Sequence, residues 1–596
     1  PRTGQLTATF SDLPRVPFTS FTLSFRGGDD AVLKAPPGCG TYAASARLEP
    51  YARPGTFVTR QATFNTNNCT TAPFAPSFAA GVDRALAGGD THLSLTVARG
   101  DEQPLLDRMV VRMPPGLLGR MAAIPSCPLE LARGGLCGPD SRVGTVTVQA
   151  GTGGAPATLT GTIHLTPGFD GGIAGLAVVV PARVGPIDLG HVVVINKMVI
   201  RPEVGVDVVS EPLPRIVGGV PLALRSMTLS LDRDGFLINA SSCAPQAITA
   251  ALVSVTGEQA EGSAPYEPTG CDRLPFEPQV TAAVGDPVTA PSLTVTIEGR
   301  PGHATMAGTR LTLPAQVGAN LQALNRTCLH DDWVAGNCPA RARIGSAEAV
   351  SPLIPVPLSG PVTLVQVPGR TLPSLAIDLS GPVNVRLRAD NDPAGGRLRS
   401  TVAGIPDVPL SRFTLKLDGG GLLKSDLRML CTGTPRLDAV FTSHSGAQAQ
   451  VRTTPSMPCK AEAKATATLT GAAKGRKPSL RVRVTGKRLK SVRVALPRQL
   501  RPAGIKALRR HARVLQGGRK LSLRTKAGKR ALRRTGSSIT VSATRKHTGS
   551  IDLRLRGGAL RRGKGLKVGR KLTLKVTVRD ADGRARTLSV RVRARR

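Results

Sequence analysis

Aromatic side chains are scarce in this 596-residue chain, which has 13 Phe, three Tyr and one Trp. No segment approaches 18 consecutive apolar residues, so no transmembrane helix is expected. The chain also has no GxSxG, HExxH or P-loop motif, and no GxGxxG that follows an expected strand. Its eight histidines stand singly. We therefore expect a protein that is not an enzyme and that has no cofactor, metal site or small-molecule substrate.

The abundant residue types indicate folded domains. Glycine and proline are frequent (66 and 49 residues), but the glycines have no three-residue period, which excludes collagen. An apolar content of 40% is enough for packed cores and argues against general disorder. At about 150 residues per domain, the length predicts roughly four domains.

Positive charge is concentrated at the C-terminal end. The chain has 80 Lys and Arg against 39 Asp and Glu, a formal charge of +41. Residues 461–596 contain 42 of the basic residues and four acidic ones, which gives 42 − 4 = +38. The first 460 residues hold the other 38 and 35, a net charge of +3. The basic segment also lacks aromatic residues and cysteine, so a domain boundary is expected near residue 460.

Internal repeats organise the first 460 residues. GQLTATFSDLPRVPFTSFTLSFRGG near the start is similar to VPLALRSMTLSLDRDGF and to GRLRSTVAGIPDVPLSRFTLKLDGGG further on. A second unit, DRMVVRMPPGLLGRMAAIPSC, alternates with the first and returns as GTRLTLPAQVGANLQALNRTC. Modules of about 100 residues are expected: a partial module 1–75 with Cys39 and Cys69, then 76–170 with Cys127 and Cys137, 171–276 with Cys243 and Cys271, 277–368 with Cys328 and Cys338, 369–460 with Cys431 and Cys459, and the basic, cysteine-free domain 461–596. The chain opens at Pro1 inside a repeat, so we expect a fragment or processed chain whose signal peptide is not visible.

The ten cysteines are expected to form structural disulfides. Each repeat carries its own pair, which predicts the pairings 39–69, 127–137, 243–271, 328–338 and 431–459. Metal binding is the alternative, but there is no CxxC and no histidine at ligand spacing from these pairs. Disulfides persist in oxidising compartments, so we expect an exported protein located outside the cell or in its envelope.

Alternation of apolar and polar residues predicts antiparallel strands throughout. It is regular at 571–579 and 588–595, and also in THLSLTV, PSLTVTIEG, LRSMTLSL and SRFTLKL. Short strands separated by Gly, Pro and Asp predict a mainly β protein, a string of immunoglobulin-like antiparallel β-sandwich modules. One helical interruption is expected in each module of the second type, for example where Ile505, Leu508, Ala512 and Leu515 follow helical spacing.

These strings resemble large exported repeat proteins of actinobacteria that combine tandem disulfide-containing β modules with a basic C-terminal β domain. The resemblance is carried by LPRQLRPAGIKALRRHARVLQGGRKLSL, GRKLTLKVTVRDADGRARTLSVRVR and CPARARIG. It implies a bacterial, envelope-associated or extracellular protein and assigns no catalytic residue.

A set of basic side chains alternates with apolar positions on the strands of the C-terminal segment, and such a face is suited to polyanions. The ten candidate polyanion-binding residues are Arg481, Arg483, Arg493, Arg554, Arg556, Lys571, Lys575, Arg579, Arg591 and Arg593. The segment has no aromatic residue for base stacking, so single-stranded nucleic acid is disfavoured. An anionic cell-wall polymer, an acidic glycan or lipid headgroups are the expected partners. Extracellular DNA bound through phosphates, and an adhesin function of the neutral repeats, remain as alternatives.

Two further clusters of polar residues have simpler structural interpretations. His330, Asp331, Asp332 and Trp333 lie between Cys328 and Cys338 and are expected at a polar loop tip rather than at a metal. Asp232-x-Asp234-Gly235 and Asp580-x-Asp582-Gly583 resemble the start of a calcium loop but lack its downstream Glu, so turns are expected there.

Overall fold

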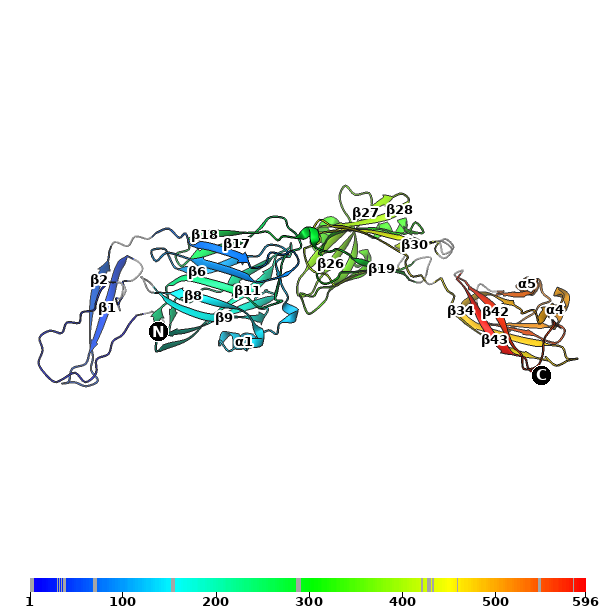
Figure 1. Cartoon of the computed structure of the whole chain (residues 1–596), viewed down its shortest axis with the longest axis horizontal. Helices are drawn as coiled ribbons and strands as arrows, with labels where there is room; N and C mark the ends of the chain where they lie inside the picture. The colour runs from blue at the N-terminus through cyan, green and yellow to red at the C-terminus, as the bar shows by residue number, and fades with distance from the viewer. Residues whose placement is uncertain are drawn as a thin grey trace.

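The structure is a computed structural model in which β units follow one another in an extended string (Figure 1). The prediction of a mainly antiparallel β protein with tandem units is confirmed. The model describes residues 5–596 except 29–30, 32, 34, 36–38, 68–71, 152–155, 286–290, 420–421, 426–429, 431–433, 458, 545–547 and 582–583.

The predicted partial module at the N-terminal end contains one hairpin, in which β1 (Gly40–Leu48) pairs with β2 (Val58–Thr66). Its side chains are mostly exposed, and none of the described residues before Phe74 is buried in an apolar core. In sequence this segment corresponds to the later strands of a full repeat unit.

The first large unit is a single antiparallel sheet whose edge strands β3 and β18 lie against each other, so that the sheet closes into a barrel. The Cα of Gly262 in β18 lies so near Phe78 of β3 that a Cβ there would be 2.3 Å from the Phe78 Cβ. The strand order is β18 (Gln259–Tyr266), β17 (Gln246–Ser254), β6 (Leu106–Arg112), β12 (Val206–Ser210), β11 (Ile187–Ile200), β10 (Ala174–Val184), β9 (Ala157–Pro167), β8 (Arg142–Ala150), β15 (Leu224–Leu231), β5 (Leu93–Ala98) and β3 (Ser77–Val82).

The second large unit repeats this order strand for strand. Its sheet runs β32 (Gln448–Thr453), β31 (Leu437–Ser443), β21 (Met306–Thr312), β28 (Arg397–Ala403), β27 (Val385–Ala394), β26 (Ser374–Leu379), β25 (Leu358–Gln366), β24 (Arg343–Val350), β29 (Arg412–Leu417), β20 (Leu293–Glu298) and β19 (Gln279–Val284), and β23 (Cys328–Leu329) also pairs with β25. We call these two units the first and second barrels. Short ladders lie outside the main sheets: β4 (Asp90–Thr91), β16 (Leu237–Ile238) and β7 (Leu118–Gly119) in the first barrel, β22 (Val317–Ala319) and β30 (Leu423–Ser425) in the second.

Each barrel therefore contains two of the predicted 100-residue modules. In the first barrel, β17 from the expected module 171–276 pairs with β6 from the expected module 76–170. One continuous apolar core includes side chains from both. In the second barrel, β31 pairs with β21 in the same way, across the expected boundary at 368/369. Neither half can bury its apolar face alone, which explains why the alternating sequence repeats do not correspond to separate domains.

Three of the predicted disulfides are present among the described residues: Cys127–Cys137, Cys243–Cys271 and Cys328–Cys338. Cys39 and Cys459 are also disulfide-bonded, whereas their expected partners Cys69 and Cys431 lie outside the described residues.

The Cys127–Cys137 loop holds a short helix, α1 (Leu129–Arg133), against the outside of the first barrel. Ala132 of α1 is fully buried with Ala177 of β10 and Ile195 of β11. Their neighbours Leu176 and Val194 point the other way, into the barrel core. Strand β10 is buried on both faces for this reason, and its sequence is almost continuously apolar.

The two barrels contact each other end to end. Asp407 of the second barrel accepts hydrogen bonds from the backbone N–H groups of Ser241 (2.9 Å) and Ser242 (3.1 Å) in the first. The backbone N–H of Ala122 donates to the carbonyl of Leu353 at 3.1 Å. Leu118 and Ile238 pack against Leu353 in a small apolar cluster at the same joint.

The basic C-terminal domain is a two-layer β structure with its own core, built only from residues of the segment 461–596. Its central strand β34 (Ser479–Ala495) passes from one layer to the other at a register shift between Thr485 and Leu489. Layer one consists of β33 (Ala463–Thr470), the first half of β34, β40 (Thr548–Leu555), β36 (Ala512–Gln516) and β37 (Arg519–Leu521). Layer two consists of β38 (Leu532–Thr535), β39 (Ser538–Ser542), the second half of β34, β42 (Lys571–Asp580) and β43 (Ala585–Arg593), and β35 (Leu500–Pro502) pairs with β41 (Leu560–Arg562) apart from both.

The helix expected from Ile505 onward is shorter than predicted. The helix α4 covers Ile505–His511, and Ala512 already begins strand β36. The prediction of helix at Ala512 and Leu515 was wrong because pairing of β36 with β40 takes these residues into the sheet. A second short helix, α5 (Lys526–Ala531), was not anticipated.

Candidate functional site

The structure distributes the ten candidate residues over the outer surfaces of both layers of the basic domain. Nine of them are exposed and Arg554 is half-buried. Layer one carries Arg481, Arg483, Arg554 and Arg556, with Arg556 just past the end of β40. Layer two carries Arg493, Lys571, Lys575, Arg579, Arg591 and Arg593. The ten residues thus form two groups with different surroundings.

Among the described residues, the layer-two group forms a face without acidic side chains. Lys571 lies opposite Arg593, and Thr573 opposite Arg591, on the paired strands β42 and β43. Arg579 lies opposite Ser491 and Lys575 opposite Ala495, on the other side of β42. The outward residues are basic, hydroxyl-bearing or Ala, and no Asp or Glu is among them in the described strands.

One basic residue of this face was missed in the sequence. Arg533 of β38 lies opposite Thr540, which in turn lies opposite Arg493. Its strand is only four residues long, so alternation gave no signal there. We call the outer surface formed by Arg493, Arg533, Lys571, Lys575, Arg579, Arg591 and Arg593 the basic face.

The layer-one group is partly neutralised by an acid. Arg481 and Arg554 lie opposite each other, and both form ion pairs with Asp552, at 2.8 and 2.9 Å. Burial acts to raise the pKa of the Asp552 carboxyl, but hydrogen bonds from the two guanidinium groups outweigh it and lower that pKa. The hydrogen bond to Asp552 likewise raises the pKa of Arg481. These two arginines serve a local ion pair and are less available to a ligand than the basic face.

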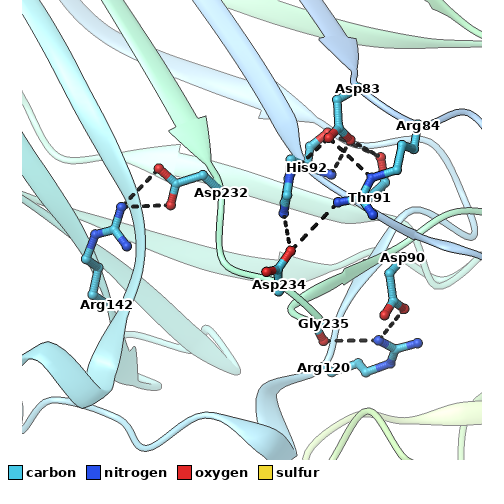
Figure 2. Close-up of polar contacts among 10 residues, drawn as sticks. All are labelled: Asp83, Arg84, Asp90, Thr91, His92, Arg120, Arg142, Asp232, Asp234 and Gly235. Carbon is cyan, nitrogen blue, oxygen red and sulfur yellow. Dashed lines mark hydrogen bonds and ion pairs between the residues drawn. The ribbon is translucent and has the colours of Figure 1, made fainter.

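A polar cluster surrounds His92 at one end of the first barrel (Figure 2). The Nδ1 of His92 lies 2.9 Å from Asp83 Oδ2, and its Nε2 lies 3.1 Å from Asp234 Oδ1. A neutral imidazole has a single N–H, so only the protonated ring donates to both carboxylates. The backbone N–H of His92 also donates to Asp83 at 2.8 Å and is the largest cause that lowers the pKa of Asp83 to about 2.

This cluster links the turn after β15 to the strands beside it. Arg120 pairs with Asp90 at 2.5 Å and donates to the carbonyl of Gly235 at 3.1 Å (Figure 2). Asp234 is 92% exposed. We therefore assign the contacts of His92 to the attachment of a surface turn rather than to a reaction site.

The two aspartates of the 232–235 motif have separate partners. Asp232 accepts hydrogen bonds from Arg142 at 2.9 and 3.0 Å, whereas Asp234 faces His92 (Figure 2). Gly235 has φ of +72°, as a tight turn requires. In the described part of the chain, no three His, Cys, Asp or Glu side chains gather where they could hold a metal ion.

The second calcium-like motif is described only in part. Asp580 is buried and accepts hydrogen bonds from the Nε of Arg584 at 2.6 Å and from its backbone N–H at 2.9 Å. Asp582 and Gly583 lie outside the described residues.

The segment His330–Val334 is not the expected polar loop tip but a short helix, α2. The indole N–H of Trp333 donates to Asp378 at 2.9 and 3.0 Å, and the ring packs on the Cys328–Cys338 disulfide and the outside of the second barrel. Alternation around Asp378 gave no hint of this contact, because its partner Trp333 lies 45 residues earlier in the chain. Asp331 and Asp332 stand in the first turn of α2, where negative charge is favourable.

Among the described residues, no helix has the length and apolar character that a membrane-crossing helix needs.

Comparison with known proteins finds solved structures of low sequence identity to this chain. No protein-family model matches the chain, and no curated protein matches it. Three similar solved structures are the MSCRAMM ACE of Enterococcus faecalis, described as binding its ligands by the collagen hug model (7% identity, 63% of this chain and 93% of that chain, TM-score 0.16), a protein of Corynebacterium diphtheriae described as membrane-anchored (8%, 94% and 97%, 0.15) and the full-length major pilin SpaD of Corynebacterium diphtheriae (8%, 63% and 81%, 0.15). At these scores, the similarity carries no argument about function.

Proposed function

We propose that the protein is a non-enzymatic structural protein of the bacterial cell envelope, and that its C-terminal domain binds an anionic polymer of the cell surface. The observation that carries this proposal is the basic face. Seven cationic side chains share one sheet surface on which no described acidic residue lies.

The close spacing of these charges destabilises the domain when no ligand is bound. Neighbouring strands lie about 4.8 Å apart, and next-but-one residues on a strand about 6.8 Å apart. Both distances are below the Debye length of about 8 Å at physiological ionic strength, so the charges repel one another. A polyanion that lies across the strands removes this repulsion and releases its own counterions, which favours binding.

The chemistry of the face favours phosphate or carboxylate groups over stacked bases. Arg493, Arg579 and Arg591 present guanidinium groups beside the hydroxyls of Thr573, Thr577 and Ser491, and both group types donate to anionic oxygens. No aromatic residue is present in the domain. A flexible chain of repeated anionic groups, such as an anionic cell-wall polymer, fits this surface best.

Export of the protein is supported by its cysteines. Three disulfides close within the described residues, and disulfides persist in oxidising compartments. The barrels and the neutral part of the chain would then extend away from the surface to which the basic domain is bound.

This proposal is tested by measuring retention of the full-length protein on purified cell walls, on phosphatidylglycerol vesicles and on duplex DNA, each across a salt series. We expect the strongest retention on the walls, with a steep loss as salt rises. Stronger binding to duplex DNA would replace this function by the nucleic-acid alternative. No binding to any of the three at 20 mM salt would exclude a polyanion partner.

A further inference from the structure

An apolar cavity of about 270 Å³ lies in the second barrel and continues into the first. In the second barrel it is lined by inward-facing side chains of β20, β21 and β24 to β29, and in the first barrel by side chains that include Met198, Val208 and Phe236. An engineered apolar cavity of about 150 Å³ is known to bind benzene. The cavity of the second barrel is large enough for a longer molecule.

The width of the barrel and the scarcity of aromatic side chains in the described lining explain the empty space. A closed sheet of eight strands is just filled by its side chains, and the main path of this sheet has three strands more. In the described part of the second barrel, Phe413 is the one aromatic residue in the cavity lining. Val385, Leu387 and Leu398 line the cavity and pack on the core, yet remain only half-buried.

Four polar side chains interrupt this apolar lining among the described residues: Ser351, and at neighbouring positions Thr309, Asn391 and Ser400. Ser400 lies opposite Asn391 on the paired strands β27 and β28. At the matching place in the first barrel, Val208 lies opposite Met198. The repeat aligns Thr309 with Met109, because Pro314 and Pro114 follow at the same distance. Three apolar residues of the first barrel are therefore replaced by polar ones in the second.

One member of this trio lacks a hydrogen-bond partner. Ser400 donates to the side-chain oxygen of Asn391, whose amide in turn donates to the carbonyl of Pro373 at 2.7 Å. The Thr309 hydroxyl makes no hydrogen bond with the rest of the described protein, although the residue is only 9% exposed. A buried hydroxyl without a partner is costly, so a ligand group that came within reach of the Thr309 hydroxyl would gain a hydrogen bond that the described protein does not supply.

The lining also restricts the charge of the ligand. No Lys, Arg, His, Asp or Glu is among the described residues that line the cavity. A carboxylate or ammonium group would be buried there without a counter-charge, which is strongly unfavourable. The ligand's polar group is therefore uncharged, and a hydroxyl, an ester or a protonated acid meets this requirement.

From these observations we propose that the second barrel binds a single-chain amphiphile with an uncharged headgroup, its chain in the cavity and its headgroup hydrogen-bonded to Thr309. A methylene group takes roughly the volume of one water, about 30 Å³, so the chain holds on the order of ten methylenes. The site is in a different domain from the basic face, and either proposal can fail without the other.

This inference is tested with the full chain and the bound fluorophore N-phenyl-1-naphthylamine. The measurement is displacement of the fluorophore by 1-decanol, methyl decanoate or sodium decanoate. At pH 8 we expect displacement by the alcohol and the ester but not by decanoate. Decanoate should gain affinity as the pH falls towards the pKa of a free carboxylic acid. Equal affinity for decanoate and decanol at pH 8 would overturn the assignment of an uncharged headgroup. Absence of displacement by all three would overturn the site.

Two variants locate the ligand. Thr309→Val removes the hydroxyl at nearly constant shape and is expected to weaken 1-decanol binding about threefold to tenfold, without a loss of melting temperature, because the hydroxyl has no partner to lose. Thr309→Met restores the residue of the first barrel, fills part of the cavity and should abolish displacement. As a control, Met109→Leu in the first barrel should leave decanol binding unchanged. Unchanged decanol binding in both Thr309 variants, with native melting curves, would contradict the proposal.

Discussion

Lys571 and Arg593 lie directly opposite each other on the paired strands β42 and β43, with both side chains exposed on the outer surface of the basic domain. Like charges at such a cross-strand position destabilise a sheet. A domain selected only for stability would have an acid at one of the two positions. Under our proposal, an anionic partner would remove the repulsion within this pair.

Replacement of Lys571 by Glu tests this relationship. Lys571→Glu turns the repulsion with Arg593 into an attraction, so we expect the free energy of unfolding at low salt to rise by about 0.2–1 kcal/mol. Retention on purified cell walls should fall at the same time, because the partner's charges now meet an acid. Arg481→Glu is the matched control: it breaks an ion pair with Asp552, so it should lower stability and affect retention less. A gain of retention in Lys571→Glu would contradict the function assigned to the face.

The helix α1 gives a prediction about the disulfides. Cys137→Ser opens the ten-residue loop that holds α1, and with it Ala132, on the outside of the first barrel. Closure of a loop of this size contributes about 3 kcal/mol. We expect a lower melting temperature and early proteolytic cleavage near Arg133. Reduction of the wild-type protein should reproduce the cleavage, and resistance to protease in both cases would show that packing alone holds α1.

The polar cluster of Figure 2 predicts a particular acid sensitivity. The pKa of Asp83 is lowered from 3.8 to about 2, chiefly by the backbone N–H of His92. The carboxylate therefore contributes stability above about pH 4, and this contribution is lost as the pH falls through 2. Asp83→Asn should be less stable than wild type at pH 6, and the difference should shrink towards pH 2. Because the side chain is 45% exposed, we expect a small effect. A difference that is constant with pH in urea unfolding would refute this assignment.

The joint between the barrels depends on Asp407. Its side chain accepts from two backbone N–H groups of the first barrel, and the Thr305 hydroxyl donates to it as well. Asp407→Ala leaves these donors unpaired, at a cost of about 1–3 kcal/mol for each that stays buried. We expect the two barrels to separate more easily, with a wider distribution of overall dimensions in small-angle X-ray scattering. Asp407→Asn keeps one acceptor oxygen and should have an intermediate effect. An Asp407→Ala variant as rigid as wild type would show that the apolar contacts of Leu353 suffice.

The strands and several disulfides could be predicted from the sequence because their signals are local. Alternation at 571–579 reflects one buried and one exposed face, and β42 covers these residues. The cysteine pairs recur with each repeat, and Cys127–Cys137 follows from that recurrence. Pairing between distant strands is different in kind, since the pairing of β17 with β6 joins residues more than 130 positions apart. Nothing in either strand indicates its partner.

The candidate site was predictable only as a set of residues. Alternation identifies which side chains point outward, and all ten candidates lie on outer surfaces. Their division into two layers arises from the register shift within β34, at Arg488, whose φ is +47°. The sequence could not show that Asp552 pairs with Arg481 whereas Lys571 meets Arg593. Likewise, Thr309 gave no signal, because its isolation becomes visible only inside a closed barrel.

The central claim is tested most directly by comparing two variants that lose the same net charge, one on the basic face and one elsewhere in the domain. One full-length variant replaces Arg493, Lys571, Lys575, Arg579, Arg591 and Arg593 by Ser, and its control replaces six exposed basic residues elsewhere in the domain: Lys506, Arg510, Lys526, Lys529, Arg530 and Lys564. Retention on purified cell walls is measured from 50 to 500 mM salt. We predict that the face variant loses most of its retention and of its salt dependence, whereas the control keeps both. An equal loss in the two variants would contradict the account, because net charge and not this face would then govern binding.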